Sequence, residues 1–291
     1  MKTSASRSSL ILLLAAVIWG VAFVFQNMGA DHLGAFAFNA LRYPLGAAVL
    51  IPIIIIKKRK NDLQMDTGIK GALIGGISCG ACLFLASSFQ QMAMSEATSG
   101  KAGFITAFYI VLVPVFGIFL KKKTSFFVWI AVILALVGLF FLCMKGSFSI
   151  ARSDGFLLAC AAVFACHILV IDHFSPKTDG VLLSCIQFAA AAVFSFAAML
   201  IFEGLPAVSD ISASFVPLLY TGIMSCGVAY TLQIIGQKNM NPAAASIILS
   251  LESCVSVIAG MLILGQMLDA WEITGCIFMF AAVLITQLRK D

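Results

Sequence analysis

Residues 242–265 read PAAASIILSLESCVSVIAGMLILG, and Glu252 is the only charged side chain among them. The other residues are apolar or small, or carry a hydroxyl or thiol that a helix can satisfy with its own carbonyl groups. A helix rises about 1.5 Å per residue, so a run of this length crosses the hydrocarbon core of a bilayer, which is about 30 Å thick. The stretch therefore predicts a membrane-spanning helix that holds one carboxylate near its middle.

The composition of the whole chain also indicates that the protein lies in lipid. Of its 291 residues, 62% are hydrophobic and 11% are charged, whereas an average soluble domain is about 25% charged. A soluble fold of this length could not cover so much apolar surface, because its own surface demands more polar residues. The chain is therefore predicted to be an all-α integral membrane protein whose apolar excess faces lipid.

The net charge of +5 does not indicate nucleic acid as a partner. The basic residues stand in short clusters between apolar runs, as the residues that orient membrane helices do. Three scattered histidines provide no metal-binding set, and the sequence contains no phosphate-binding GxxxxGK[ST] motif, no HExxH and no GxSxG. We therefore expect no metal, no cofactor and no enzymatic activity.

Counting apolar runs of about 20 residues predicts ten spans. The first is expected to be a retained helix rather than a cleaved signal, because the bulky WGVAFVFQ follows where small residues would mark a cleavage site. The expected spans cover residues 9–27, 34–56, 70–93, 97–120, 126–144, 154–173, 180–202, 214–236, 242–265 and 270–288.

The distribution of lysine and arginine predicts the orientation of these spans. With a cytoplasmic N-terminus, fourteen of these residues lie inside and three outside, as the positive-inside rule requires, and an even number of spans brings the C-terminus to the cytoplasm too. The inside set is Lys2, Arg7, Lys57, Lys58, Arg59, Lys60, Lys70, Lys121, Lys122, Lys123, Lys177, Lys238, Arg289 and Lys290, and the outside set is Lys101, Lys145 and Arg152.

The two halves of the chain resemble each other. The fourth expected span opens with SEATSGKAGFITAF and the ninth with NPAAASIILSLES, and each follows a polar, glutamine-containing stretch. Because each half, residues 9–144 and 154–288, holds five spans, the second copy is expected to lie inverted in the membrane. Inverted repeats are common in secondary transporters, where the substrate site lies near the midplane between the halves.

The segments ATSGKAGFITAFYIVLVPVFG and NPAAASIILSLESCVSVIAG, together with the opening LLAAVIWGVAFVF, resemble the EamA family of the drug/metabolite transporter superfamily. The resemblance covers nearly the whole chain. It implies a ten-helix carrier with cytoplasmic termini and a central cavity between its halves, usually exporting amino acids, related metabolites or drugs. Members of that family often carry Glu-Pro in the fourth or ninth span, where this chain has Tyr109 with Pro114 and Glu252-Ser253.

Two residues of opposite charge lie near the middle of their expected spans, Glu252 in the ninth and Arg42 in the second. An arginine at a helix centre costs about 2.5–3.5 kcal/mol on insertion scales, and such residues face the bundle interior or a wet cavity. The two side chains either neutralise each other or flank a site that binds a zwitterion. For Arg42 a further alternative is that carbonyls freed by a kink at Pro44 accept its donors.

Six further residues are candidates for the substrate site or for proton coupling. His167 is deep enough to relay protons, although a buried histidine with satisfied hydrogen bonds is the structural alternative. Lys101 stands close to the start of its span, where it either snorkels to the interface or serves as a gate charge. Polar or aromatic side chains deep in their spans either line a cavity or pack, namely Trp19, Gln90, Tyr109 and Tyr230.

These features favour a secondary transporter in the cell (inner) membrane. It is expected to move a small metabolite or drug outward by alternating access, with a proton gradient as one source of energy and the bilayer as its surroundings. The alternatives are an intramembrane lipid-processing enzyme and a non-transporting scaffold or channel. The sequence leaves the oligomeric state open, a homodimer included.

Overall fold

The computed structural model describes residues 2–122, 124–143, 151–238, 240–265 and 270–288. Four of the basic residues that carry the orientation argument, Lys123, Lys145, Arg289 and Lys290, lie outside these ranges. The described residues are almost entirely helical and form no β-strand, apart from an isolated antiparallel bridge between Met65 and Thr178. The predicted all-α class is confirmed for this part of the chain.

Long, uninterrupted helices make up most of the bundle. They are α1 (Lys2–Ala30), α2 (Ala35–Arg59), α3 (Gly68–Ala93), α6 (Phe126–Cys143), α7 (Arg152–Phe174), α8 (Gly180–Phe202) and α14 (Ala270–Leu288). The remaining crossings consist of consecutive segments, α4 (Ser99–Thr106) with α5 (Tyr109–Phe119), α10 (Phe215–Leu219) with η1 (Tyr220–Tyr230) and α11 (Thr231–Gln237), and α12 (Pro242–Leu249) with α13 (Glu252–Leu264). A short helix, α9 (Val208–Ala213), precedes α10.

Eight helical stretches of the described chain are long and apolar enough to cross a membrane. Two shorter apolar helices, Phe126–Gly138 and Ile273–Ile285, lie within α6 and α14. The eight stretches are Ser6–Ala30, Ala35–Arg59, Gly68–Ala93, Ser99–Phe119, Arg152–Phe174, Gly180–Phe202, Phe215–Gln237 and Pro242–Leu264.

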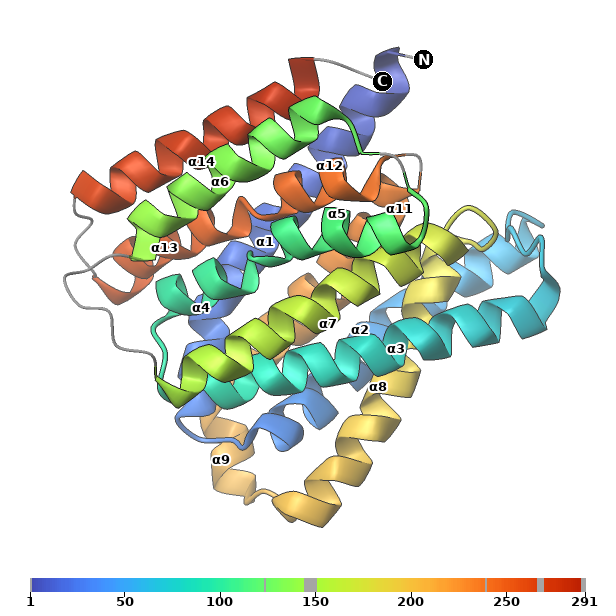
Figure 1. Ribbon diagram of the computed structural model, residues 1–291. Coiled ribbons are helices and arrows are strands. Elements are labelled where there is room, and N and C mark those ends of the chain that lie inside the picture. The colour runs from blue at the N-terminus through green and yellow to red at the C-terminus, as the bar shows by residue number, and fades with distance from the viewer. Residues whose placement is uncertain (1, 123, 144–150, 239, 266–269, 289–291) are drawn as a thin grey trace.

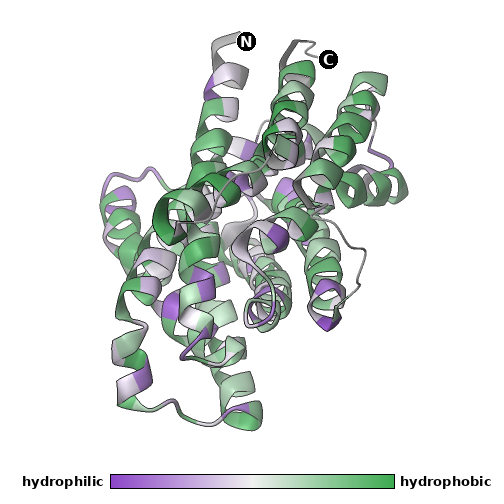
Figure 2. Ribbon diagram, turned by 90° about the vertical axis from the view of Figure 1, so that its left-hand side faces the viewer, coloured by the Kyte–Doolittle hydropathy of each residue, from purple (hydrophilic) through white to green (hydrophobic). Residues whose placement is uncertain are grey.

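The surface of the bundle is apolar along these helices. Large hydrophobic side chains are widely exposed on them, among them Val193 at 66% and Leu262 at 73% of full exposure. Figure 2 shows hydrophobic residues along the helices and hydrophilic ones mainly at the connections. Lipid is the solvent that suits such a surface, because exposed apolar patches of this extent are not tolerated in water.

Two of the expected spans are broken near their middles, which the sequence did not predict. The spans expected as continuous over 97–120 and 242–265 are divided, so that α5 starts at Tyr109 and α13 at Glu252. At each break the backbone makes tight bonds to the third preceding residue, Phe108 N–H to Ile105 O at 3.1 Å and Leu251 N–H to Ile248 O at 3.2 Å.

Serine hydroxyls accompany the break between α12 and α13. Ser246, Ser250, Ser253 and Ser256 each donate to the carbonyl three residues earlier, at 2.7–2.8 Å. Such back-bonding competes with the regular helical ladder and bends helices. The breaks matter because they set the first residue of α5 and of α13 inside the bundle.

The crossing made of α10, η1 and α11 is also irregular. Over Tyr220–Tyr230 the backbone is π-helical, a form that is rare and frequent at functional sites. Threonine hydroxyls next to it bond back to main-chain carbonyls, Thr221 to Pro217 O at 2.7 Å and Thr231 to Gly227 O at 2.8 Å.

Contacts between helices that are distant in the sequence tie both ends of the bundle. We use the name "basic end" for the end of the bundle at which α2 and α5 stop. There Lys57 pairs with Asp179 at 2.6 Å, and Lys122 of the α5–α6 connection pairs with Asp172 of α7. Figures 1 and 2 show the first turn of α1 and the last turn of α14 on the same side of the bundle. In Figure 1 this is the side where α5 ends.

Other contacts close the opposite end. Lys101 of α4 pairs with Asp154 of α7 at 2.7 Å. The carboxylate of Glu203, just after α8, accepts hydrogen bonds from the first backbone N–H groups of α2, Phe36 at 3.0 Å and Ala37 at 2.8 Å. A carboxylate is favoured at a helix N-terminus because it satisfies orphan donors and faces the positive end of the dipole.

Candidate functional site

A cavity lies inside the bundle where the broken helices meet their neighbours. Its volume in this conformation is about 30 Å³, and its walls come from α1, α2, α3, α4, α5, α7, η1, α11, α12 and α13. The lining residues are Trp19, Phe23, Gln26, Arg42, Gln90, Thr106, Tyr109, Phe164, Ile168, Ser225, Tyr230, Gln233, Leu249 and Glu252. Polar and aromatic groups therefore converge on one space from both halves of the chain.

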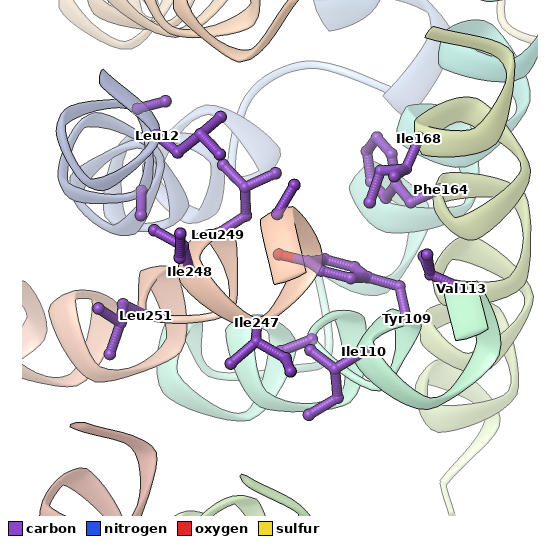
Figure 3. Packing of buried hydrophobic residues seen from close by; sticks show 14 of the residues in the cluster. Leu12, Tyr109, Ile110, Val113, Phe164, Ile168, Ile247, Ile248, Leu249 and Leu251 are labelled. Atoms are coloured by element: carbon purple, nitrogen blue, oxygen red, sulfur yellow. The ribbon is translucent and has the colours of Figure 1, made fainter. Parts of the chain in front are cut away.

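Glu252 is the first residue of α13 and is buried, with 4% of its surface exposed. Its Oε1 accepts a hydrogen bond of 2.9 Å from the hydroxyl of Tyr109, which is the first residue of α5. Figure 3 shows Tyr109 projecting from α5 towards the α12–α13 helix. Within the described part of the chain Glu252 makes no ion pair. The two helix breaks thus meet through one phenol–carboxyl contact.

Arg42 is equally buried, with 2% of its surface exposed. Its Nη1 donates to Gln26 Oε1 at 3.0 Å, and its guanidinium lies 5.4 Å and 5.2 Å from the ring centroids of Phe38 and Tyr43. The sequence offered backbone carbonyls freed by a kink at Pro44 as acceptors for Arg42. The acceptor in the structure is the side chain of Gln26 in α1. Arg42 and Glu252 line the same cavity without forming an ion pair.

The remaining wall residues pack against each other. Trp19 and Tyr230 meet edge to face with ring centroids 4.6 Å apart. Gln90 donates to Thr106 Oγ1 at 3.3 Å, which links α3 to α4. Trp19, Gln90, Tyr109 and Tyr230 thus lie together with Arg42 and Glu252, although they are distant in the sequence.

Two candidates from the sequence lie outside this lining. The Lys101 ammonium is held by Asp154 at the end of the bundle. His167 is fully buried, its Nε2 lies 3.1 Å from Gln187 Oε1, and its ring faces the edge of Tyr230 at 6.0 Å. Near the end of α7, Asp172 forms an ion pair with Lys122.

Several wall residues were not singled out from the sequence. Gln26 is a polar residue inside an apolar helix, and a polar side chain in such a run is a signal that could have marked it as a candidate. Thr106 and Ser225 gave none, because small hydroxyl residues are common in membrane helices and bond to their own backbone. Their place in the cavity follows from the irregular backbone around them, namely the end of α4 and the π-helical η1.

A family model described as "EamA-like transporter family" matches the chain twice, over residues 6–144 and 152–288. The chain belongs to the EamA-like transporter family. The resemblance seen in the sequence is thereby confirmed, and this EamA-like chain is a multi-pass membrane transporter. The matched segments together contain every residue of the cavity lining.

Relatives of this EamA-like transporter are named as transporters too. An uncharacterized transporter of Archaeoglobus fulgidus is 28% identical over 284 residues, which cover 96% of this chain and 85% of the relative. The transporters YoaV and YwfM of Bacillus subtilis, also named as uncharacterized, are 22% and 26% identical; the alignments cover 94% and 95% of this chain and 94% and 92% of those proteins. A solved crystal structure shares the fold, with a TM-score of 0.75, 18% identity and 97% coverage of both chains.

The site of this EamA-like transporter is suited to binding a small polar molecule. Its wall offers a guanidinium, a carboxyl group, carboxamides, hydroxyls and aromatic faces around one cavity. Sites for small molecules are generally concave, mostly apolar and equipped with a few convergent polar groups. The cavity can therefore bind and orient an occupant by its polar ends.

Proposed function

We propose that this transporter is a ten-helix secondary carrier that moves a small metabolite, such as an amino acid, or a drug out of the cell by alternating access. The observation that carries the proposal is the cavity lined from both halves, with Arg42 and Glu252 both buried in its lining and not paired. An ionisable group inside a membrane bundle is a functional group by default, because its burial is otherwise unfavourable.

An inverted repeat of residues 9–144 and 154–288 is supported by the two helix breaks. Ser99 and Pro242 begin the first segments, and Tyr109 and Glu252 begin the second segments, each pair being 143 positions apart. Broken helices of this kind form the binding sites of several transporter families built from inverted repeats. In this arrangement the cavity lies at the midplane.

The proposed orientation places the basic end of the bundle, with both termini, in the cytoplasm of a cell whose inner membrane holds the carrier. Lys57, Lys122, Lys177 and Lys238 lie at or near the ends of helices there, and lysine is the residue that marks cytoplasmic connections. Glu252 is proposed as the group that either binds a substrate cation or exchanges a proton during transport. A homodimer remains compatible with the apolar outer surface.

Counterflow in proteoliposomes tests the function. Vesicles are preloaded with a pool of amino acids and small metabolites, and the entry of labelled tracers is followed. A carrier gives saturable, transient accumulation of a tracer whose unlabelled form was preloaded. Flux that does not saturate would instead identify a channel, and no flux of any tracer would favour a scaffold.

The seam between α4–α5 and α7 is proposed to open and close during transport. These helices come from different halves and are joined at the opposite end by Lys101–Asp154 and at the basic end by Lys122–Asp172. Alternating access requires each end of the cavity to open in turn, so one ion pair would separate at a time. Partly exposed ion pairs are worth about 0–1 kcal/mol, which makes them suitable as reversible contacts.

Reversing the charge at one end of this seam is therefore expected to impair transport. In Lys122→Glu two carboxylates face each other, and we expect the counterflow rate to fall about fivefold, the equivalent of about 1 kcal/mol. Adding Asp172→Lys restores opposite charges and should recover most of the rate. Lys58→Glu, an exposed residue at the same end, is the control. Equal losses in Lys58→Glu and Lys122→Glu, or no recovery in the double variant, would contradict the role of the seam.

A further inference from the structure

The cavity contains a permanent positive charge, Arg42, which forms no ion pair with Glu252, the acidic residue of the same lining. We propose that Arg42 is the subsite for a carboxylate of the transported molecule, an assignment that rests on the proposed carrier function and narrows its substrate class. A molecule that lacks an anionic group would then be a poor substrate, even when its size and apolar surface suit the cavity.

The first argument is the charge balance of the buried groups. Arginine stays protonated in proteins, so burial cannot neutralise Arg42 by loss of a proton. Buried acidic residues elsewhere in the described chain are already paired, Asp154 with Lys101 and Asp179 with Lys57. A buried charge without a partner is strongly unfavourable. The counter-ion of Arg42 is therefore assigned to the occupant of the cavity.

The second argument is a pair of hydrogen-bond donors that have no acceptor. Arg42 Nε and Trp19 Nε1 are buried and make no hydrogen bond, and both residues line the cavity. Each nitrogen can only donate, and a buried donor without an acceptor is unfavourable. Gln233 Oε1 of the same lining is an acceptor that also makes no hydrogen bond and bonds neither nitrogen. A carboxylate of the occupant would provide the acceptor that these two donors lack. Both nitrogens are buried in the present shape of the cavity, so the occupant reaches them as the walls adjust around it.

The third argument is that the guanidinium is held in place in advance. Gln26 accepts from Nη1, and the rings of Phe38 and Tyr43 flank the charge at 5.4 Å and 5.2 Å. Aromatic faces attract a cation without satisfying its hydrogen bonds. A planar fork oriented in this way matches the two oxygens of a carboxylate.

Other groups of the same lining limit the total charge of the occupant. Glu252 and Tyr109 present a carboxyl group and a phenol, which suit a hydrogen-bond donor of the substrate. A dianion such as a phosphate monoester would bring a second negative charge into the cavity that also holds the carboxyl group of Glu252. The arrangement thus favours a small monocarboxylate whose other end carries a donor and whose body packs on Phe23 and Phe164.

Binding to the purified full-length protein, measured as thermal stabilisation over a concentration series, tests the assignment. The probes share three skeletons. Each skeleton is tested as the amino acid, as the amine that lacks the carboxylate and as the acid that lacks the amine. The first set is leucine, isoamylamine and 4-methylpentanoate, and the second is phenylalanine, phenethylamine and 3-phenylpropionate. The third set is tryptophan, tryptamine and indole-3-propionate. Phenyl phosphate represents a dianion. For at least one skeleton the compounds with a carboxylate should bind about tenfold more tightly than the amine, since a hydrogen bond to a charged group is worth that factor or more.

Arg42→Gln should remove this preference for the compounds with a carboxylate, whereas Arg42→Lys should keep part of it. The matched control is Arg152→Gln, an exposed arginine that stacks on Phe156 at 5.5 Å outside the cavity. Should Arg42→Gln not fold, Trp19→Phe removes the second donor while keeping an aromatic ring, and acids should bind about threefold more weakly to it.

The outcomes separate this assignment from the function on which it rests. Wild-type protein that prefers the amines or phenyl phosphate, or Arg42→Gln that keeps the preference for acids, would overturn the carboxylate subsite and leave a carrier in place. A wild-type protein that binds none of the probes and shows no counterflow would contradict the carrier function itself.

Discussion

Glu252→Gln is expected to lower the rate of counterflow by about tenfold or more and to leave the helical bundle folded. Glutamine has nearly the same shape and still accepts the hydrogen bond from Tyr109, which is 2.9 Å long in the native chain. It carries no negative charge and cannot exchange a proton, so the interactions lost with a substrate cation or a coupled proton are worth about 1.5–3 kcal/mol. Initial rates in proteoliposomes measure the effect.

Glu96→Gln is the matched control, because Glu96 is an exposed glutamate between α3 and α4. Its rate should stay at the wild-type level. Counterflow by Glu252→Gln at the wild-type rate, with unchanged dependence on pH, would reduce Glu252 to a structural partner of Tyr109. Loss of monodisperse protein would point to the same structural role.

Gly20→Val is expected to destabilise the protein and abolish transport. A Cβ at position 20 of α1 would lie 2.4 Å from the Cβ of Val255 and 2.8 Å from the carbonyl oxygen of Glu252. The backbone of α13 has to move, since a carbonyl cannot swing away as a flexible side chain does. Overpacking of this kind costs about 1–3 kcal/mol, occasionally more. The displaced segment is the one that begins with Glu252, so its carboxyl group would leave the cavity wall.

Thermal denaturation of the purified variant, read as loss of monodisperse protein, measures the destabilisation. Gly155→Val is the control, because a Cβ at position 155 of α7 would meet no atom within 4 Å. Both variants add the same side chain to a helical glycine, so their difference isolates the contact between α1 and α13. Equal stability of the two variants would show that this contact yields without strain.

The fold class was predictable because lipid imposes one requirement on every span. A bilayer offers no hydrogen bonds, so a crossing segment is apolar and helical, and that is visible in composition. Glu252 and Arg42 were predictable for a related reason, since a charge in an apolar run stands out. The contacts that these two side chains make could not be predicted. Arg42 meets Gln26 of the neighbouring helix, a contact that depends on helix rotation, which a nearly uniform apolar sequence does not encode visibly.

The pairing of Tyr109 with Glu252 was not predictable from the sequence for a second reason. Both residues are candidates in the sequence, but they are 143 positions apart and meet because each begins a helix segment after a break. The breaks rest on local backbone bonds and on serine hydroxyls that look the same in a continuous helix. Lys101 was correctly placed near the end of its span, yet its partner Asp154 follows from the packing of α4 against α7.

The π-helical turns of η1 have a consequence for how such a cavity changes in evolution. A π-helical stretch behaves as an α-helix that has accommodated additional residues, so a one-residue deletion within Tyr220–Tyr230 would relax towards α-helical geometry. In an α-helix one residue corresponds to about 100° of rotation. Such a deletion would turn Gln233 of α11 away from the cavity wall and present a different side chain. A single codon lost or gained here would therefore exchange one wall of the binding site while the rest of the bundle keeps its contacts.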